Sequence, residues 1–511
     1  MSAKKYLCIH GHFYQPPRED AWTNEISPQP SAAPFHDWNE RIFQECYKPN
    51  AHAVIVDDSD NVITKVNNYE YLSFNFGSTL IHWIKKIHPK TYQLIIDADK
   101  ISVIKRKGHG NAIAMVYNHI IMPLANERDK ITQIKWGIED FKFHFNREPE
   151  AIWLSETACN QATVEALINE NIKYIILDPS QAEKTRKAKR GKWKDVSNGS
   201  INSKIAYRCY SEKLKNKFIN IFFYDGPLSR NIAFDDHIYD ATKLANRIMQ
   251  NVDAKCKTDQ LISSAIDGET FGHHKNFAER TLAYLFYELA QRSGLTVTNF
   301  GEYLENHPSE YEVKIKTGRD GEGTSWSCMH GVGRWKEDCG CSGGGINGWN
   351  QEWRSPLRDA LNWLRDKIAK IYEDAGSHFL KDVWNARNDY IKVILTPDLK
   401  TGSEFFYHNA KRYLSSEESE FCIKLLEMQR YGLLMFTSCG WFFADISGIE
   451  TIQILQYAAR AIEIAYEVSG KNLENQFLEK IAEAKSNKPE EKNGREIYLK
   501  HFAKRVPDFH N

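Results

Sequence analysis

The sequence predicts an α/β fold in which a barrel or distorted barrel of parallel strands precedes a C-terminal α-helical domain. Over the first ~340 residues, short apolar runs alternate with amphipathic segments, the pattern of βα units around a parallel sheet. Seven of these runs qualify as strands, and strand signals nearly vanish from about Pro356 onward. At 511 residues the chain is long enough for two or three domains.

The expected strands are short apolar runs separated by turn or helix signals. In chain order they are Tyr6–Ile9, Tyr71–Phe74, Ala112–Tyr117, Ala151–Leu154, Ile172–Leu177, Phe218–Tyr224 and Leu261–Ile266. Helices are expected between them, for example at Ile131–Phe145, Thr163–Asn169 and Asn276–Arg292. Two polar insertions, Lys187–Ser203 and Lys316–Ser325, are predicted to form surface loops or lids.

The last third of the chain has helical periodicity. Apolar residues recur at helical spacing in two stretches, Leu357–Ile368 and Ile452–Ile462. The segment Ser486–Arg495 is charged and is expected to be solvated. We therefore expect a barrel domain with lid loops over residues 1–345 and a helical domain over residues 346–511.

Composition excludes several classes of protein. Lys+Arg and Asp+Glu both number 67, so there is no basic excess to indicate a nucleic-acid partner. No apolar stretch approaches the ~20 residues of a membrane-spanning helix. The segment Met1–Lys5 runs directly into a strand-like run and lacks the features of a signal peptide. With ten scattered cysteines, this predicts a cytoplasmic protein with reduced thiols.

Two of the expected strands end in carboxylates. The run at Leu261–Ile266 leads directly into Asp267-Gly268-Glu269, and the run at Ala151–Leu154 leads into Ser155-Glu156. An α/β enzyme presents an acid from a strand end and the turn that follows it. Two such carboxylates are what hydrolysis of a glycosidic bond requires, because one attacks and the other protonates the leaving oxygen.

The first expected strand ends in a polar cluster, His10-Gly11-His12 followed by Gln15. Neutral histidine and glutamine can hold sugar hydroxyls, because each of them both donates and accepts hydrogen bonds. A metal site is a second interpretation, since His-x-His with a later aspartate can bind zinc. The spacing alone leaves both interpretations open.

Five blocks between His10 and Gly272 resemble, in order, the motifs of glycoside hydrolase family 57. They are His10-Gly11-His12 with Gln15-Pro16, then Phe74–Leu80, Tyr117–Leu124, Trp153–Ala158 and Asp267–Gly272. The region Trp326–Glu450 is similar to a subgroup with an extra helical domain. The resemblance implies a (β/α)7-type distorted barrel, a retaining mechanism and α-glucan substrates, with no catalytic metal or other cofactor.

The resemblance also implies roles for individual residues. Glu156 is expected to be the nucleophile and Asp267 the general acid/base. Side-chain chemistry, taken together with these motifs, gives the residues expected to bind or orient the substrate: His10, His12, Gln15, His119, Trp153, Glu269, His273 and Trp441. Of the two tryptophans, Trp441 lies in a Gly-containing turn and is the better candidate for stacking on a sugar ring. The chain departs from the family pattern at Ser78 and Ser155, where prolines are usual, and at Asn111, where many members have a carboxylate.

A Gly-rich segment contains Cys328-Met329-His330 and then Cys339-Gly340-Cys341. These are four ligands of the types that zinc favours. Their spacing is unlike the common zinc patterns, in which two residues usually separate paired cysteines. Reduced cysteines in a loop and a structural zinc site are both consistent with the sequence.

Three classes of function remain. The first is a retaining enzyme acting on α-1,4-glucans as an amylase, glucanotransferase or branching enzyme, activities that share every catalytic residue. The second is a metal-dependent carbohydrate deacetylase that uses His10, His12 and an aspartate as ligands. The third is a non-catalytic glucan-binding protein, although such a protein has no need of the Glu156 and Asp267 pair.

Overall fold

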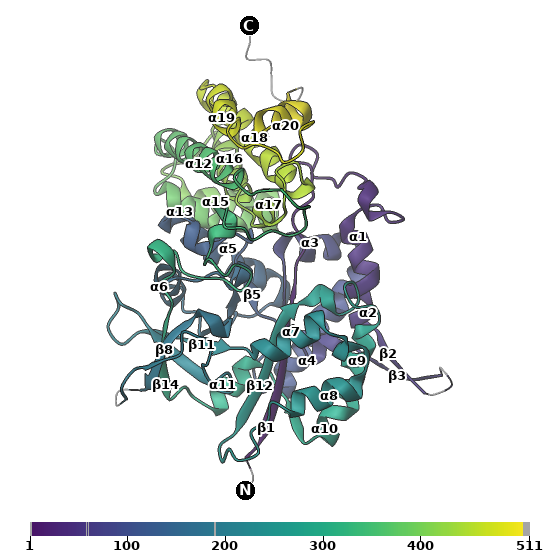
Figure 1. Ribbon diagram of the computed structural model, residues 1–511. Coiled ribbons are helices and arrows are strands. Elements are labelled where there is room, and N and C mark those ends of the chain that lie inside the picture. Colours follow the sequence, from purple (N-terminus) through teal and green to yellow (C-terminus); the bar gives the residue numbers. More distant parts are fainter. Residues whose placement is uncertain (1–2, 58, 60, 189–190, 504–511) are drawn as a thin grey trace. The chain divides into compact units, whose positions relative to one another are not determined.

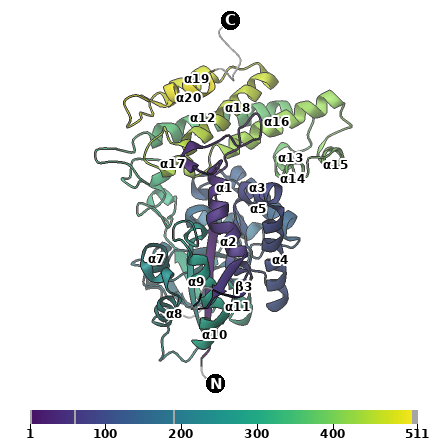
Figure 2. The same ribbon diagram turned by 90° about the vertical axis from the view of Figure 1, so that its right-hand side faces the viewer.

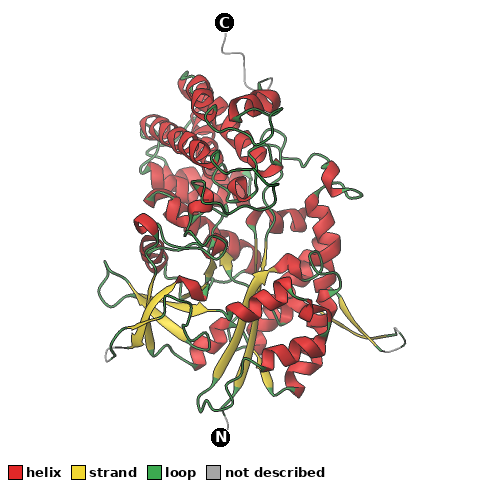
Figure 3. Cartoon of the chain, viewed as in Figure 1, coloured by secondary structure: helices red, strands yellow, loops and turns green. Residues whose placement is uncertain are grey.

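The computed structural model describes residues 3–57, 59, 61–188 and 191–503. The chain divides into two compact units. Unit 1 consists of Met1–Gln15, Ser27–Met115 and Phe141–Thr317, and unit 2 of Pro16–Ile26, Val116–Asp140 and Gly318–Asn511. Every strand that the structure describes belongs to unit 1, whereas unit 2 consists of helices and loops (Figure 3). The expected domain boundary at residue 345 stays a prediction.

Unit 1 is built around seven parallel strands. They are β1 (Lys5–Phe13), β4 (Ser73–Phe76), β5 (Ala114–Met115), β6 (Ile152–Trp153), β7 (Tyr174–Leu177), β11 (Phe218–Phe223) and β12 (Gln260–Asp267). Each of them overlaps one of the seven strands expected from the sequence. The longest pair, β1 and β12, lies side by side in register from Lys5 with Gln260 to His12 with Asp267 (Figure 1).

These strands follow one another around a closed barrel. β1 pairs with β12 on one side and with β4 on the other. An isolated bridge between Phe74 and Ala112 leads to β5, which pairs with β6. A bridge from Ala151 leads on to β7, which pairs with β11. The N–H of Asp225, just after β11, donates to the carbonyl oxygen of Ser263 on β12 at 2.8 Å and closes the circle. The predicted distorted (β/α)7 barrel is thereby confirmed.

The barrel strands can be recognised in the sequence because they are buried on both faces. From Gln260 to Ile266 every residue of β12 is buried, and all four residues of β7 are buried. Strands covered on both sides read as nearly continuous apolar runs. The expected strand at Ala112–Tyr117 is shorter in the structure, because the chain turns at Tyr117 and Asn118 soon after β5.

A second sheet branches from β11 within unit 1. β10 (Ala206–Tyr210) pairs antiparallel with β11, and the sheet continues through β14 (Tyr311–Ile315), β8 (Ala182–Lys187) and β9 (Lys194–Asp195). The insertion expected as a loop at Lys187–Ser203 thus contains the short strand β9, and its residues 189–190 lie outside the described part. Two further pairings involve β2 (Ala53–Val56) with β3 (Val62–Val66), and β13 (Leu295–Val297) with the start of β1.

Helices connect the strands of unit 1. They are α1 (Trp38–Ile42), α2 (Lys48–Ala51), α3 (Ser78–Ile87), α4 (Pro89–Lys105), α6 (Gln161–Asn169), α7 (Gly226–Phe234), α8 (Ala241–Met249), α9 (Ala278–Tyr284), α10 (Ala290–Arg292) and α11 (Phe300–Asn306). Several begin at a side-chain cap: the Asn160 amide oxygen accepts from Thr163 N–H, and Asp225 accepts from Leu228 N–H. Such caps satisfy backbone donors that the first helical turn leaves unpaired.

Unit 2 is helical. Its helices are α12 (Arg354–Gly376), α13 (Val383–Asp389), α14 (Ile391–Leu395), α15 (Leu399–Asn409), α16 (Ser416–Leu434), α17 (Cys439–Phe442), α18 (Ile449–Ser469), α19 (Glu474–Ile481) and α20 (Gly494–Phe502), joined by most of α5 (Glu127–Phe145). α16 packs against both α12 and α18, and Figure 2 shows these long helices next to one another. The two helical stretches expected from periodicity correspond to α12 and α18.

A buried ion pair joins two segments of unit 2 that are far apart in sequence. Arg387 lies 2.8 Å from the Asp129 carboxylate and also donates to Thr132 Oγ1 at 2.8 Å. Both members of the pair are almost fully buried, so each charge depends on the other.

Among the described helices of the whole chain, none is long and apolar enough to cross a membrane.

Candidate active site

Asp267 is the last residue of β12, where the strand gives way to the turn Gly268–Thr270. His12 on β1 is paired with Asp267 on one side and with Asn75 of β4 on the other. Residues paired across parallel strands point to the same face of a sheet, so these three side chains share one face. They lie at the carboxyl end of the barrel strands, the end at which barrel enzymes carry their active sites.

Glu156 lies just beyond β6 in a tight turn, Ser155–Thr157. Its φ is +58° and that of Thr157 is +50°, a left-handed conformation that costs a side-chain-bearing residue free energy. Gln181 holds the turn in place, because its amide accepts from Thr157 Oγ1 and donates to Thr157 O, both at 2.8 Å. These two hydrogen bonds thus hold the strained turn that carries Glu156 at the strand end.

The two carboxyl groups are electrostatically coupled. The pKa of Asp267 is raised from 3.8 to about 7, chiefly by loss of water around the carboxyl group and then by the negative charge of Glu156. Protein atoms surround the Asp267 carboxyl group on most sides although the residue keeps an exposed surface, and Glu156 is half-buried. Near neutral pH, Asp267 can therefore hold a proton next to an acidic neighbour, which is how one of two paired carboxyls becomes a general acid.

Glu269 is a third acid in this neighbourhood, and it is buried. Its Oε1 accepts from the backbone N–H of Tyr14 at 2.9 Å and from the hydroxyl of Tyr47 at 2.6 Å. Burial raises its pKa from 4.5 to about 8, and the charge of Asp267 adds to the effect, while the Tyr47 hydrogen bond opposes it. Glu269 is therefore neutral at neutral pH and anchors the segment that follows β1.

The two histidines of β1 form one buried stack with Trp153. The ring of His10 lies 4.8 Å from the Trp153 ring and that of His12 lies 5.0 Å from it, both nearly parallel to the indole. Asn75 bridges the imidazoles, with its Oδ1 at 3.2 Å from His10 Nε2 and from His12 Nδ1, and Ser73 Oγ lies 3.0 Å from His10 Nδ1. Burial lowers both pKa values to about 3, so both rings are neutral.

Gln15 and His273 also belong to unit 1. Gln15 is buried and donates to Tyr14 O at 3.0 Å. The His273 ring hydrogen-bonds the carboxylate of Glu45, while its backbone N–H donates to Glu269 O at 3.0 Å. His273 is thereby tied to the Glu269 turn through its main chain, and its Nδ1 is directed to Glu45.

His119 and Trp441 lie in unit 2. His119 is buried, and its Nδ1 lies 2.6 Å from Ser438 Oγ. Trp441 is fully buried: its Nε1 donates to Arg354 O at 3.3 Å and the guanidinium of Arg358 lies 3.7 Å from the ring centre. The expectation that Trp441 stacks on a sugar is corrected by this burial, because packing partners already cover the indole. The sequence could not distinguish a Trp in a Gly-containing turn from a Trp in a core.

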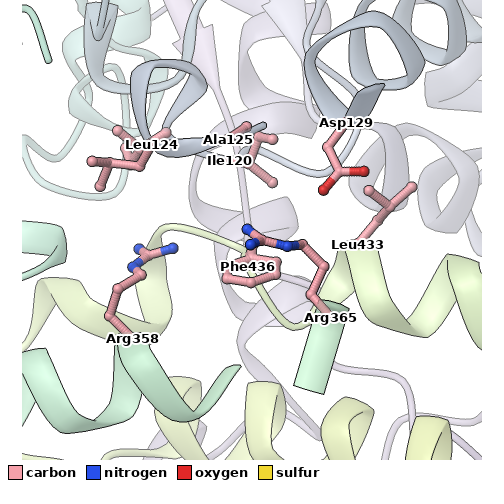
Figure 4. Close-up of a pocket in the computed structure, with 9 residues that line it drawn as sticks. Ile120, Leu124, Ala125, Asp129, Arg358, Arg365, Leu433 and Phe436 are labelled. Atoms are coloured by element: carbon pink, nitrogen blue, oxygen red, sulfur yellow. The ribbon is translucent and has the colours of Figure 1, made fainter. Parts of the chain in front are cut away.

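A small cavity of unit 2 lies beside Arg358 (Figure 4). It is lined by Ile120, Ile121, Leu124, Ala125, Asp129, Arg358, Arg365, Leu433 and Phe436. Its volume of about 10 Å³ is the space that one water molecule needs. The cavity is too small for a glucose ring and is not a substrate site.

Several residues that support the site could not be identified from the sequence alone. Asn75 lies inside one of the motif blocks, yet only the pairing of β4 with β1 places it between the two histidines. Tyr47 reaches Glu269 across 222 positions of the chain, and Gln181 supports the Glu156 turn from the segment after β7. Asn111, the position that departs from the family pattern, is fully buried and hydrogen-bonds Asn299, so it serves the core of unit 1.

Comparison with known proteins agrees with this arrangement of strands and carboxylates. Residues 8–316, more than half of the chain, match the model of glycosyl hydrolase family 57. The chain belongs to this family. Residues 349–511 match a second model, described only as a domain of unknown function, DUF3536. The family and the enzyme class predicted from the sequence are thereby confirmed.

Individual relatives of the family are distant in sequence. Alpha-amylase 1 of Dictyoglomus thermophilum is 22% identical over 139 residues, which cover 27% of this chain and 18% of that protein, less than a fifth of its length. The crystal structure of an exo-type maltose-forming amylase from Pyrococcus sp. ST04 superposes with a TM-score of 0.69 at 14% identity, covering 93% of this chain and 82% of that one. The crystal structure of a branching enzyme of the family from Pyrococcus horikoshii superposes with a TM-score of 0.58 at 14% identity, covering 93% of this chain and 94% of that one. The structural likenesses establish the shared fold.

Proposed function

We propose that this protein cleaves or transfers α-1,4-glucan chains with retention of configuration, with Glu156 as nucleophile and Asp267 as general acid/base. The observation that carries the proposal is the pair of carboxyl groups, each at the carboxyl end of a barrel strand, in which burial and then the Glu156 charge raise the pKa of Asp267. An ionised carboxylate beside a protonated one is the state in which a retaining glycosidase begins its reaction. The likeness to a maltose-forming amylase and to a branching enzyme supports malto-oligosaccharides and α-glucans as substrates.

In the first step, a carboxylate oxygen of Glu156 attacks the anomeric carbon of the bound sugar. The bond from that carbon to the glycosidic oxygen breaks, and Asp267 gives its proton to the departing oxygen. The products are a covalent glycosyl ester on Glu156 and a shortened glucan with a free hydroxyl. Retention predicts that the two carboxyl groups lie ~5–5.5 Å apart when substrate is bound.

In the second step, the ionised Asp267 accepts a proton from an incoming hydroxyl as its oxygen attacks the anomeric carbon. The ester bond to Glu156 breaks and the carboxylate is restored. If the incoming hydroxyl belongs to water the result is hydrolysis, and if it belongs to a second glucan the result is transfer. The catalytic carboxyls are the same in both cases, so the acceptor alone determines the product.

The surrounding groups support the pair by position and charge. His12 shares a strand register with Asp267, and the stack on Trp153 keeps its ring rigid. Glu269, which is neutral at neutral pH, adds no charge that would raise the pKa of Asp267 further. We therefore assign His12 and Glu269 to positioning Asp267, with His10, Gln15 and His273 as candidates for holding the site or the sugar hydroxyls. The role expected of His119, in unit 2, stays a prediction.

The decisive experiment incubates the full chain with maltoheptaose and amylose in the presence of a chelator and separates the products by chain length. Glu156→Gln and Asp267→Asn should each abolish new products, while Glu305→Gln, an exposed carboxylate of the same unit, should leave them unchanged. Incubation with a slow fluorinated glycosyl substrate should add one sugar mass to the peptide that contains Glu156. Products of unchanged length from the wild-type chain, or labelling at another residue, would overturn the assignment.

The same experiment tests the other classes of function. A deacetylase would need His10, His12 and an aspartate to share a metal. Both imidazole rings instead hydrogen-bond Asn75. Among the described residues, neither histidine belongs to a group of three ligands that could reach one ion. Acetate release that a chelator abolishes would support that class. Binding of amylose without new products would indicate a glucan-binding protein.

A further inference from the structure

Four potential metal ligands of unit 2 converge in one place. They are Cys328, His330, Cys339 and Cys341, and one ligand atom from each lies within 4.8 Å of all the others. Cys328 is buried, Cys339 and Cys341 are partly exposed and His330 is exposed, so the cluster lies close to the surface. The chain brings them together across a connection of eight residues between His330 and Cys339. Three thiols and an imidazole form a donor set characteristic of structural zinc sites.

Two of the distances between the ligand atoms are those expected for a tetrahedral zinc site. Cys328 Sγ lies 3.8 Å from Cys339 Sγ, and Cys341 Sγ lies 3.6 Å from His330 Nδ1. With Zn–S bonds of ~2.3 Å and a Zn–N bond of ~2.0–2.1 Å, tetrahedral geometry places two sulfurs ~3.8 Å apart and a sulfur and a nitrogen ~3.6 Å apart. Both separations therefore match a single ion bound between the four side chains. The distance between the two sulfurs is far longer than the ~2.05 Å bond of a disulfide.

The backbone around the cluster is arranged to hold thiolates. The N–H groups of His330 and Arg334 donate to the sulfur of Cys328, and that of Cys341 donates to the sulfur of Cys339. Such hydrogen bonds stabilise a sulfur that carries negative charge, which is the form that binds a metal. Gly331, directly after His330, has a φ of +85° and allows the turn that returns the chain toward Cys328.

Buried positive charge surrounds the cluster. Arg354 at the start of α12 is fully buried, donates to Cys341 O at 2.6 Å, and is close enough to the thiols of Cys328 and Cys339 to interact with them electrostatically. Arg334 is also buried. Three thiolates and one Zn²⁺ carry one net negative charge, so the guanidinium groups would neutralise a filled site.

We propose that these four side chains, Cys328, His330, Cys339 and Cys341, bind one structural zinc ion. All four coordination positions are filled by protein, which leaves none for a water or substrate, so the ion is structural and not catalytic. Zinc binding would release the thiol protons to solvent and fix the Gly-rich segment on α12 and α17, to which it is already joined by Arg354 and by the bridge of Gly343 with Phe443. The inference is independent of the glycosidase proposal.

The test begins with the metal content of the full chain purified in reducing buffer without added metal or chelator. Elemental analysis should find about one zinc per chain, as expected for a closed four-ligand site. Cys341→Ser should lose that zinc and lower the melting temperature of the protein. Cys256→Ser, a partly exposed cysteine of unit 1, is the matched control and should keep both. The glycosidase assay is not needed as a readout.

A second measurement covers the case in which the variant does not fold. Wild-type protein stripped of metal under reducing conditions is titrated with Co²⁺ alone, and then with Zn²⁺. The visible absorption of tetrahedral thiolate-bound cobalt should saturate at about one equivalent and disappear when zinc displaces the cobalt. The proposal would be overturned if the purified protein contained no zinc and also took up neither cobalt nor zinc. A disulfide between Cys328 and Cys339 in the non-reduced peptide map would overturn it as well. Stoichiometric iron in place of zinc would refute the choice of ion.

Discussion

Replacing Glu269 with glutamine should stabilise the protein at neutral and alkaline pH but not in acid. The glutamine amide keeps an oxygen that can accept from Tyr14 N–H and Tyr47 O–H, the two donors that Glu269 Oε1 serves at 2.9 and 2.6 Å. What the substitution removes is an ionisable group that is buried and has a pKa raised from 4.5 to about 8. The packing and hydrogen bonds of the turn are otherwise preserved.

The sign and size follow from proton linkage. Between about pH 4.5 and pH 8 the folded protein holds a proton on Glu269 that the unfolded chain has lost, so the free energy of unfolding falls as pH rises. At about 1.4 kcal/mol per pH unit, this group removes at most about 5 kcal/mol of stability by pH 8. Below about pH 4.5 both states are protonated and this contribution disappears.

The assay is urea unfolding of the wild type and Glu269→Gln, followed by tryptophan fluorescence at pH values between about 5 and about 8. The free energy of unfolding of the variant minus that of the wild type should grow steadily with pH. Glu305→Gln, an exposed control, should show a difference that does not depend on pH. A constant difference for Glu269→Gln, or a variant less stable than the wild type at pH 8, would refute the reasoning.

Three further predictions concern the pair, the stack and unit 2. First, Asp267 must be protonated to act as an acid, and burial together with the Glu156 charge raises its pKa to about 7. The value of kcat/KM for maltoheptaose should therefore fall at alkaline pH with a midpoint near pH 7, and a profile that stays flat to about pH 9 would contradict the assignment. Second, Trp153→Ala should lower the free energy of unfolding by about 3–5 kcal/mol in urea titrations, since it empties a buried site against two histidines. Third, Asp129→Ala should cost about 3–5 kcal/mol in the same assay by leaving Arg387 buried without its partner, and the double replacement with Arg387→Met should recover much of the loss.

The local sequence was sufficient to predict the barrel and the positions of its two carboxyl groups. Strands buried on both faces appear as apolar runs, and a strand end followed by glycine or a tight turn marks where a polar group leaves the core. Glu156 and Asp267 could therefore be placed at the carboxyl ends of β6 and β12 from their own neighbours in the chain. The helices α12 and α18 were predicted for the same reason, because burial along one side repeats with the helical period.

The partners of those groups depend on contacts between distant parts of the chain. Nothing near Tyr47 in the sequence indicates that it reaches Glu269, and the neutral state of Glu269 follows from a burial that periodicity does not report. Trp441 has the local signature of an accessible turn, yet its ring is packed in unit 2. The cysteine cluster likewise has unusual spacing, and only the folded loop brings its four ligand atoms within 4.8 Å of one another. Sequence periodicity reports which faces are buried, whereas pKa values, stacking partners and ligand geometry depend on which groups meet through space.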